Sequence, residues 1–220
     1  TVRITGTKTA VADGDVADFA IVGAVEAGGG SGLSLYLVEL GGAGVVRTPV
    51  VTVDPTRSHA QLRFDDAVAE PLGPAHEGWD LVQRVYDRAA VLIAFEQLGG
   101  ADRALEMGRD YALERFAFGR PIGSLQAIKH MLADMYVSAT LARSNCYYGA
   151  WALSTGSAEL PDAAATARVS ATQAFQHCAR NNIQVHGGMG FTWNLLAVSI
   201  GALSTWEDRL IECLRARRAA

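Results

Sequence analysis

The stretch at residues 184–193 (Gln-Val-His-Gly-Gly-Met-Gly-Phe-Thr-Trp) is the most distinctive in the chain. It combines three glycines with a glutamine and two aromatic side chains in a region otherwise rich in alanine and helix formers. Glycine permits positive φ and lets another backbone or a ligand come close. A helix ending here would offer main-chain N–H groups beside Gln184, which suits an elongated ligand with a phosphate portion, such as a dinucleotide. A helix C-cap followed by a turn explains the same residues without any ligand.

A second motif covers residues 115–126 (Arg-Phe-Ala-Phe-Gly-Arg-Pro-Ile-Gly-Ser-Leu-Gln), at the expected junction of two helices. It groups a cation, an aromatic face and a glutamine around a turn that contains glycine and proline. An arginine fork binds phosphate bidentately, and a phenylalanine ring can cover the edge of an adenine or a flavin. The motif therefore favours a ligand that has both a phosphate and an aromatic ring.

Other residue types that could carry chemistry form no recognisable site. The chain has no nucleophile-elbow, zinc-protease or Cys-x-x-Cys motif, and its five histidines show no metal-ligand spacing, so no metal is expected. Glu96 differs from the other acidic residues because it lies in the apolar run 92–98. It is either a buried acid with a raised pKa or the partner in a hydrogen bond between helices.

Composition and charge limit the classes of protein. The chain has 220 residues, half of them hydrophobic, which is enough for one large domain or two small ones. A net charge of −4 argues against nucleic acid as a partner. Cys146, Cys178 and Cys213 are far apart and predict reduced core thiols in a cytoplasmic protein. No apolar run is long enough to span a membrane, no signal peptide is visible, and the chain begins at Thr1 as if a strand were already under way.

Residues 1–73 are expected to form a small antiparallel β-sandwich or barrel. Short β-branched runs alternate there with glycine and aspartate clusters. The expected strands cover residues 1–4, 19–22, 33–38, 45–48, 50–53 and 60–64. The glycines at 28–32 match no phosphate-loop pattern and precede no helix, so we expect a hairpin loop there.

The rest of the chain, residues 74–220, is expected to be helical. Residues 66–78 contain two prolines and two glycines and predict a domain boundary, after which the hydrophobic period changes from two to 3.6. Amphipathic helices are expected over residues 79–116, 121–153, 161–186 and 195–217. Gly99 and Gly100 predict a close approach of a neighbouring helix, because each glycine lowers helix propensity by about 1 kcal/mol. The expected fold class is α+β, with a small β-domain followed by a four-helix up-and-down bundle.

The two motifs together resemble the acyl-CoA dehydrogenase family. The resemblance extends to residues 113–115 (Leu-Glu-Arg) and 126–130 (Gln-Ala-Ile-Lys-His) around the second motif. The β segment is similar to the family's middle domain at residues 5–8 (Thr-Gly-Thr-Lys), 35–38 (Leu-Tyr-Leu-Val) and 62–65 (Leu-Arg-Phe-Asp). The resemblance covers almost the whole chain, as the family's middle β-domain plus its C-terminal bundle. The family's N-terminal helical domain has no counterpart in this sequence.

This resemblance implies a flavin-dependent oxidation of acyl-CoA thioesters to trans-2-enoyl-CoA. In the family a carboxylate removes the α-proton, the β-hydride passes to flavin N5, and an electron-transfer flavoprotein accepts the electrons. FAD lies across a subunit interface, with its ring against one subunit's middle domain and its pyrophosphate and adenosine on the neighbour's C-terminal bundle. The residues carried over to the neighbour's FAD come from both motifs: Arg115, Phe118, Gln126, Gln184, Gly187 and Gly188.

The sequence departs from the family at the reaction centre. Many members place an aromatic residue and a threonine against the flavin ring, and counting on from Lys8 these positions hold Ala10 and Ala12. The two family positions of the catalytic glutamate correspond to Ile200 and Ala89. An apolar side chain cannot take a proton, so the chain is expected to carry no catalytic residue.

A further departure follows Trp193, where the acidic, aromatic and basic stretch of the family is missing. Together the departures predict a subunit that holds the FAD tail while a paralogous partner supplies the ring pocket and the glutamate. The resemblance is then to the α2β2 dehydrogenases of actinobacterial steroid side-chain catabolism. Two alternatives stay open. One is a self-sufficient homotetramer with Glu96 or a residue of a missing stretch as base, and the other is a flavin-free structural or binding paralogue.

Overall fold

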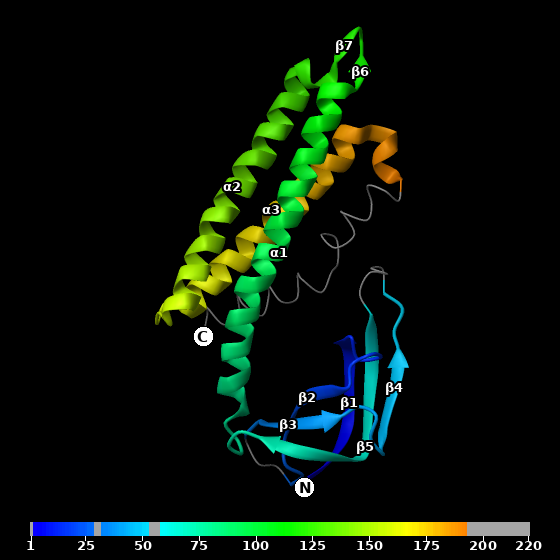
Figure 1. Cartoon of the computed structure of the whole chain (residues 1–220), viewed down its shortest axis with the longest axis vertical. Coiled ribbons are helices and arrows are strands. Elements are labelled where there is room, and N and C mark those ends of the chain that lie inside the picture. Colours follow the sequence, from blue (N-terminus) through cyan, green and yellow to red (C-terminus); the bar gives the residue numbers. More distant parts are fainter. Residues whose placement is uncertain (1, 29–31, 53–57, 193–220) are drawn as a thin grey trace. The chain divides into compact units, whose positions relative to one another are not determined.

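The computed structural model describes residues 2–28, 32–52 and 58–192. The chain divides into two compact units, Thr1–Val85 and Tyr86–Ala220, and each is treated by itself. The expected helix at 195–217, Ile200 and Cys213 lie outside the described residues. Figure 1 shows the strands of the first unit and the long helices of the second.

The first unit is built on a curled, antiparallel five-stranded sheet (Figure 1). Its strands are β1 (Val2–Ala12), β2 (Phe19–Ala24), β3 (Ser34–Glu39), β4 (Val45–Pro49) and β5 (His59–Leu72). The order is β1-β5-β3-β2, and β4 also pairs with β5. Strands β2 and β3 pair from Phe19 with Glu39 to Ala24 with Ser34, which confirms the hairpin expected around the glycines at 28–32.

Strand β5 is the centre of this unit because it pairs with three other strands. The side chains of Ala60, Leu62 and Phe64 are buried, while those of Gln61 and Arg63 between them are exposed. This alternation is what a strand produces when one face covers a core. The core itself also includes Ile4, Val22, Val38 and Leu40.

Two strand predictions are corrected by the structure. The strand expected at 60–64 is longer than predicted and extends from His59 to Leu72. It continues because its last residues pair with β3, and Pro71 lies close to its end, opposite Tyr36. The strand expected at 50–53 does not form over residues 50–52. Val51 there is fully exposed and has no sheet surface to pack against.

Three of the four expected helices are described. They are α1 (Gly78–Glu114), α2 (Gln126–Thr155) and α3 (Leu160–His186). A small hairpin of β6 (Phe116–Ala117) and β7 (Arg120–Pro121) and the 3₁₀ helix η1 (Ile122–Ser124) connect α1 to α2, and the 3₁₀ helix η2 (Gly187–Phe191) follows α3. The α+β class is therefore confirmed. No helix in the described part of the chain is long and apolar enough to cross a membrane.

Small side chains let the three helices pack closely. The buried face of α3 is mostly alanine, with Ala167, Ala171 and Ala174 in the same cluster as Ala101 of α1. A Cβ added to Gly100 would lie 2.6 Å from the Phe175 ring of α3, whereas one added to Gly99 would meet nothing within 4 Å. The close approach predicted for the glycine pair is thus confirmed at Gly100 alone.

The helical core also contains two thiols and a polar contact. Cys146 and Cys178 are free and buried, as expected of core cysteines. Burial raises the pKa of the Cys146 thiol to about 11 and that of Cys178 to about 12, so both stay protonated at neutral pH. Within the core, the Thr172 hydroxyl donates to the Gln97 side-chain oxygen at 2.9 Å and ties α3 to α1.

Candidate functional site

The two sequence motifs meet at one end of the helical unit. A buried cluster of Ala112, Ile122 and Val185 joins the last turn of α1, the connection to α2 and the last turn of α3. Beside it the rings of Tyr111 and His186 stack with centroids 4.2 Å apart and an interplanar angle of 25°. The first turns of α2 close the cluster through Leu125 and Ile128. Residues separated by about seventy positions in the sequence are therefore held side by side.

Arg115 has a fixed backbone and a free side chain. Its N–H donates to the Tyr111 carbonyl, and its own carbonyl accepts from the Ile122 N–H, both at 2.8 Å. Close by, a Cβ on Gly123 would lie 2.9 Å from the Ala112 oxygen, so only glycine lets the connection pass α1 this closely. The Arg115 guanidinium is exposed and makes no hydrogen bond or ion pair to any residue that the structure describes. It is available to an anion.

Phe118 is presented at the tip of a strained turn. Phe116 pairs with Pro121 and Ala117 with Arg120, which leaves a two-residue loop of Phe118 and Gly119. Both loop residues have positive φ, 54° and 77°, as type I′ hairpins require. A bulky residue with positive φ is an outlier, and such strain is found preferentially at functional sites. The ring is 93% exposed, so it contributes nothing to the core.

Gln126 is the first residue of α2 and is exposed. Its side-chain oxygen lies 2.7 Å from Nε2 of His130, one turn further along the helix. Since an amide oxygen only accepts, the ring nitrogen donates, and the Gln126 amide nitrogen has no partner among the described residues.

The end of α3 provides the second half of the site. Gln184 is exposed, and its carbonyl accepts from the Gly187 N–H. Gly187 has φ 59° and ψ −133°, a combination that favours glycine. Gly188 has no positive φ, and a Cβ there would meet nothing within 4 Å. A Cβ on Gly190 would lie 2.5 Å from the Ile183 oxygen. Gly190 is therefore needed for packing, whereas Gly188 borders open space.

Comparison of the chain with known proteins identifies its family. Residues 76–209 match the family described as "Acyl-CoA dehydrogenase, C-terminal domain". The chain belongs to the acyl-CoA dehydrogenase family. It is 43% identical over 145 residues to the acyl-CoA dehydrogenase IpdE2 of Mycobacterium tuberculosis, which covers 66% of this chain and 41% of IpdE2.

Two solved structures of the family extend the likeness to nearly the whole chain. The ChsE4–ChsE5 complex from Mycobacterium tuberculosis matches with a TM-score of 0.83 and 28% identity over 99% of this chain and 58% of that one. The Tcur3481–Tcur3483 steroid acyl-CoA dehydrogenase G363A variant matches with a TM-score of 0.80 and 27% identity, over 99% and 60%. The chain spans about half the length of the family members it matches.

Three of the positions that the resemblance matches to family chemistry lie in the described part of the chain, and none of the three holds an acid. Ala89, at one glutamate position, is half-buried, and Ala10 and Ala12, at the ring-contact positions, are exposed. Of the two alternatives for Glu96, the structure excludes the buried acid, because the side chain of Glu96 is exposed. The apolar run around it follows from helix geometry: Glu96 lies between the inward-facing positions Ala94 and Leu98.

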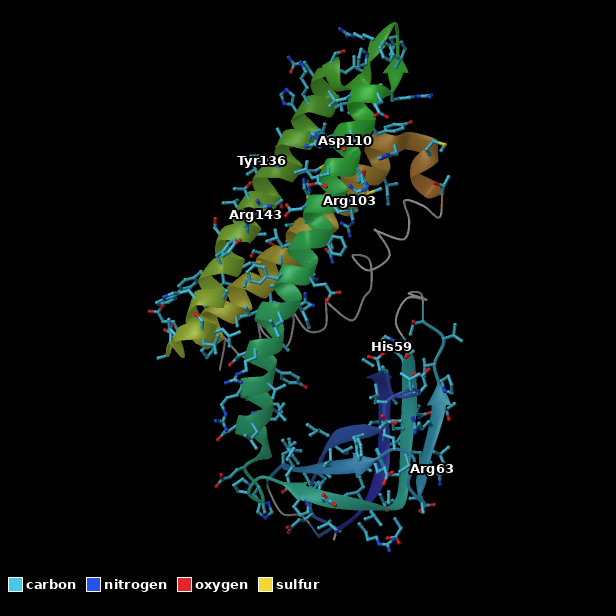
Figure 2. The ribbon with its side chains drawn as sticks, in the orientation of Figure 1. His59, Arg63, Arg103, Asp110, Tyr136 and Arg143 are labelled. Carbon is cyan, nitrogen blue, oxygen red and sulfur yellow. The ribbon has the colours of Figure 1, made fainter. Side chains whose placement is uncertain are left out.

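A separate groove runs between α1 and α2. Its volume is about 470 Å³, its lining includes Leu105 and Leu132, and Arg143, which also lines it, donates to both oxygens of Asp102 at 2.6 Å. Figure 2 labels Tyr136 and Arg143 on α2 in this region. None of the site residues carried over from the family lines this groove. The described residues contain no group of three metal-ligating side chains.

Two contacts near the candidate site were not predicted from the sequence. Tyr111 and His186 form the ring stack that joins the motifs, and His130 contacts Gln126. The four-residue spacing of Gln126 and His130 could have predicted their contact, because such positions lie on one helix face. The Tyr111–His186 stack could not have been predicted, because it depends on how α1 and α3 pack.

Proposed function

We propose that this chain is a subunit of a flavin-dependent acyl-CoA dehydrogenase that holds the pyrophosphate and adenosine of FAD. The observation that carries the proposal is the meeting of both motifs at one end of the helical unit, with Arg115, Phe118 and Gln184 all exposed. Side chains of these types, turned outward and without partners in the described chain, suit a ligand held between two subunits. In this proposal residues 1–73 are the middle β-domain and residues 74–220 the C-terminal bundle.

The donor set fits the FAD tail. The Arg115 guanidinium can bind a phosphate with two parallel hydrogen bonds, and the exposed Phe118 ring can stack on an adenine. The amides of Gln126 and Gln184 add uncharged donors, and the open space at Gly187 and Gly188 lets a ligand approach the backbone. When bound, FAD would supply the hydride acceptor of the reaction.

The same proposal assigns the proton-abstracting glutamate to a paralogous partner. Ala89 cannot serve as a base, and neither can Ile200, which lies outside the described residues. The ChsE4–ChsE5 complex, as its name says, joins two different chains in one relative. The exposure of Glu96 removes the reason for choosing it as the base of a self-sufficient homotetramer.

The substrate class follows from the family and its named members. We propose oxidation of an acyl-CoA to the trans-2-enoyl-CoA, with a steroid side-chain CoA thioester as the substrate to test first. One structural neighbour, the Tcur3481–Tcur3483 protein, is named a steroid acyl-CoA dehydrogenase. An electron-transfer flavoprotein would accept the electrons, and the assembly would act in the cytoplasm as an α2β2 heterotetramer.

The proposal is tested by purifying the full-length protein alone and together with a paralogous acyl-CoA dehydrogenase that retains the glutamate. We expect the protein alone to be colourless and inactive, and the co-purified complex to be yellow and to oxidise acyl-CoA. Flavin absorbance and dehydrogenase turnover are the two measurements. A protein that is yellow and fully active alone would overturn the division of labour, and a colourless, inactive complex would support a flavin-free binding protein instead.

A further inference from the structure

We propose that His130 is a positioning residue for Gln126, and that it turns the amide N–H₂ of Gln126 outward as a hydrogen-bond donor to the FAD tail. This inference rests on the proposed function, because it assumes that Gln126 contacts the cofactor. It assigns a role to a side chain that the resemblance itself leaves without one.

The hydrogen bond between the two side chains fixes the direction of the amide. Nε2 of His130 donates to the side-chain oxygen of Gln126 at 2.7 Å. Because that oxygen is occupied, the amide nitrogen on the other side of the same planar group must point away from the ring. It carries two N–H donors and has no hydrogen-bond partner among the described residues.

The helix around this pair is held in place from its other face. Leu125 and Ile128 pack against the buried cluster of Ala112, Ile122 and Val185. Gln126 and His130 are exposed, and positions four residues apart lie on the same side of a helix. The turns of α2 that carry Gln126 and His130 are therefore held by packing, at the same end of the unit as Arg115 and Gln184.

The orientation of the amide decides whether Gln126 attracts or repels an anion. With its nitrogen outward, Gln126 offers donors to a pyrophosphate oxygen or to an adenine ring nitrogen. With its oxygen outward, it would place a partial negative charge against the phosphates. An unrestrained glutamine samples both orientations, so a contact that selects one of them lowers the ordering required on binding.

The test is the equilibrium dissociation constant for FAD of the complex, measured by quenching of flavin fluorescence after removal and re-addition of the cofactor. His130→Phe keeps a ring but removes the donor, and we expect it to weaken FAD binding about three- to tenfold, the usual effect of one hydrogen bond. His130→Gln keeps a donor at similar reach and should bind FAD within about twofold of the parent.

A double-mutant cycle separates positioning from a general loss of structure. If His130 acts through Gln126, His130→Phe should have no further effect in a Gln126→Ala background. Equal losses in both backgrounds, or an unchanged dissociation constant for His130→Phe alone, would overturn the inference. If Gln126→Ala and Arg115→Ala weaken FAD binding while His130→Phe does not, the inference fails and the proposed function stands. If none of the three changes FAD binding, both fail.

Discussion

At the scale of single residues, the site consists of side chains that contribute little to the fold. Phe118 has a φ of 54° and is 93% exposed, and the Arg115 guanidinium has no partner in the described chain. A side chain in the left-handed region costs roughly 1–2 kcal/mol. The pairing of β6 with β7 imposes this backbone conformation but does not require a phenylalanine, and the proposed function assigns the exposed ring to a ligand.

Replacing Phe118 with asparagine should therefore separate stability from binding. Asn tolerates positive φ, so Phe118→Asn should raise the free energy of unfolding by about 0.5–1 kcal/mol. The same change should weaken FAD binding, because it removes the stacking surface. Urea denaturation and FAD titration measure the two effects.

The matched control is Phe116→Asn, at a residue of the same hairpin that is 63% exposed and has no positive φ. It should bring no gain in stability. A Phe118→Asn variant that is less stable than the parent would show that the ring packs against something, and the strain argument would be wrong.

The sequence singled out these residues by their types near glycines and by the family resemblance, and their contact with a cofactor stays a prediction. The positive φ of Phe118 was not predictable, because it follows from the two-residue loop that the pairing of Ala117 with Arg120 imposes. The sequence could not decide between the two alternatives for Glu96, because an apolar run on a helix includes positions that face outward.

At the scale of elements, the crossing of α1 and α3 determines where the site lies. The two helices approach each other at Gly100 and Phe175, and the stack of Tyr111 on His186 follows further along. The predicted helix bounds were close to the observed ones, since hydrophobic period and glycine or proline punctuation are local signals. The start of α2 was placed too early, at residue 121, because Pro121 is taken up by β7 and Ile122–Ser124 by η1.

The crossing gives a prediction with an adjacent control. Gly100→Ala would place a Cβ 2.6 Å from the Phe175 ring, so we expect it to lower the free energy of unfolding by about 1–3 kcal/mol through overpacking. Gly99 is exposed, and a Cβ added there would meet no atom within 4 Å. Gly99→Ala should therefore raise the free energy of unfolding by roughly 0.5–1 kcal/mol through helix propensity. Urea denaturation of both variants gives the comparison. Equal effects of the two changes would contradict the close approach.

The β-domain shows where local signals fail. Strand β5 continues through residues that contain Pro71 because it moves from pairing with β1 to pairing with β3, a long-range event. Val51 and its neighbours have the composition of a strand, yet residues 50–52 form none, and the Val51 side chain is fully exposed. β-propensity reflects a surface to pack on, and such a surface cannot be read from a single run of residues.

At the scale of the whole molecule, the chain belongs to the acyl-CoA dehydrogenase family, and the resemblance matches apolar residues to the family positions of the catalytic glutamate. The family match covers residues 76–209, while Ala89, at one family position for the base, cannot take a proton. In the proposed function this chain binds the cofactor tail and a partner removes the proton, so that the chain is one half of an enzyme. The sequence led to this hypothesis through its departures from the family as much as through its matches.

The most direct measurement is the dissociation constant for FAD of the complex in which this chain alone carries Arg115→Ala. A bidentate, charge-assisted contact contributes about 1.5–3 kcal/mol, so binding should weaken by about 10- to 100-fold. Arg103→Ala removes an exposed arginine of α1 that forms an ion pair with Glu106, and it should leave FAD binding unchanged. If the Arg115→Ala complex binds FAD as tightly as the Arg103→Ala complex, this chain does not hold the FAD tail through the proposed site.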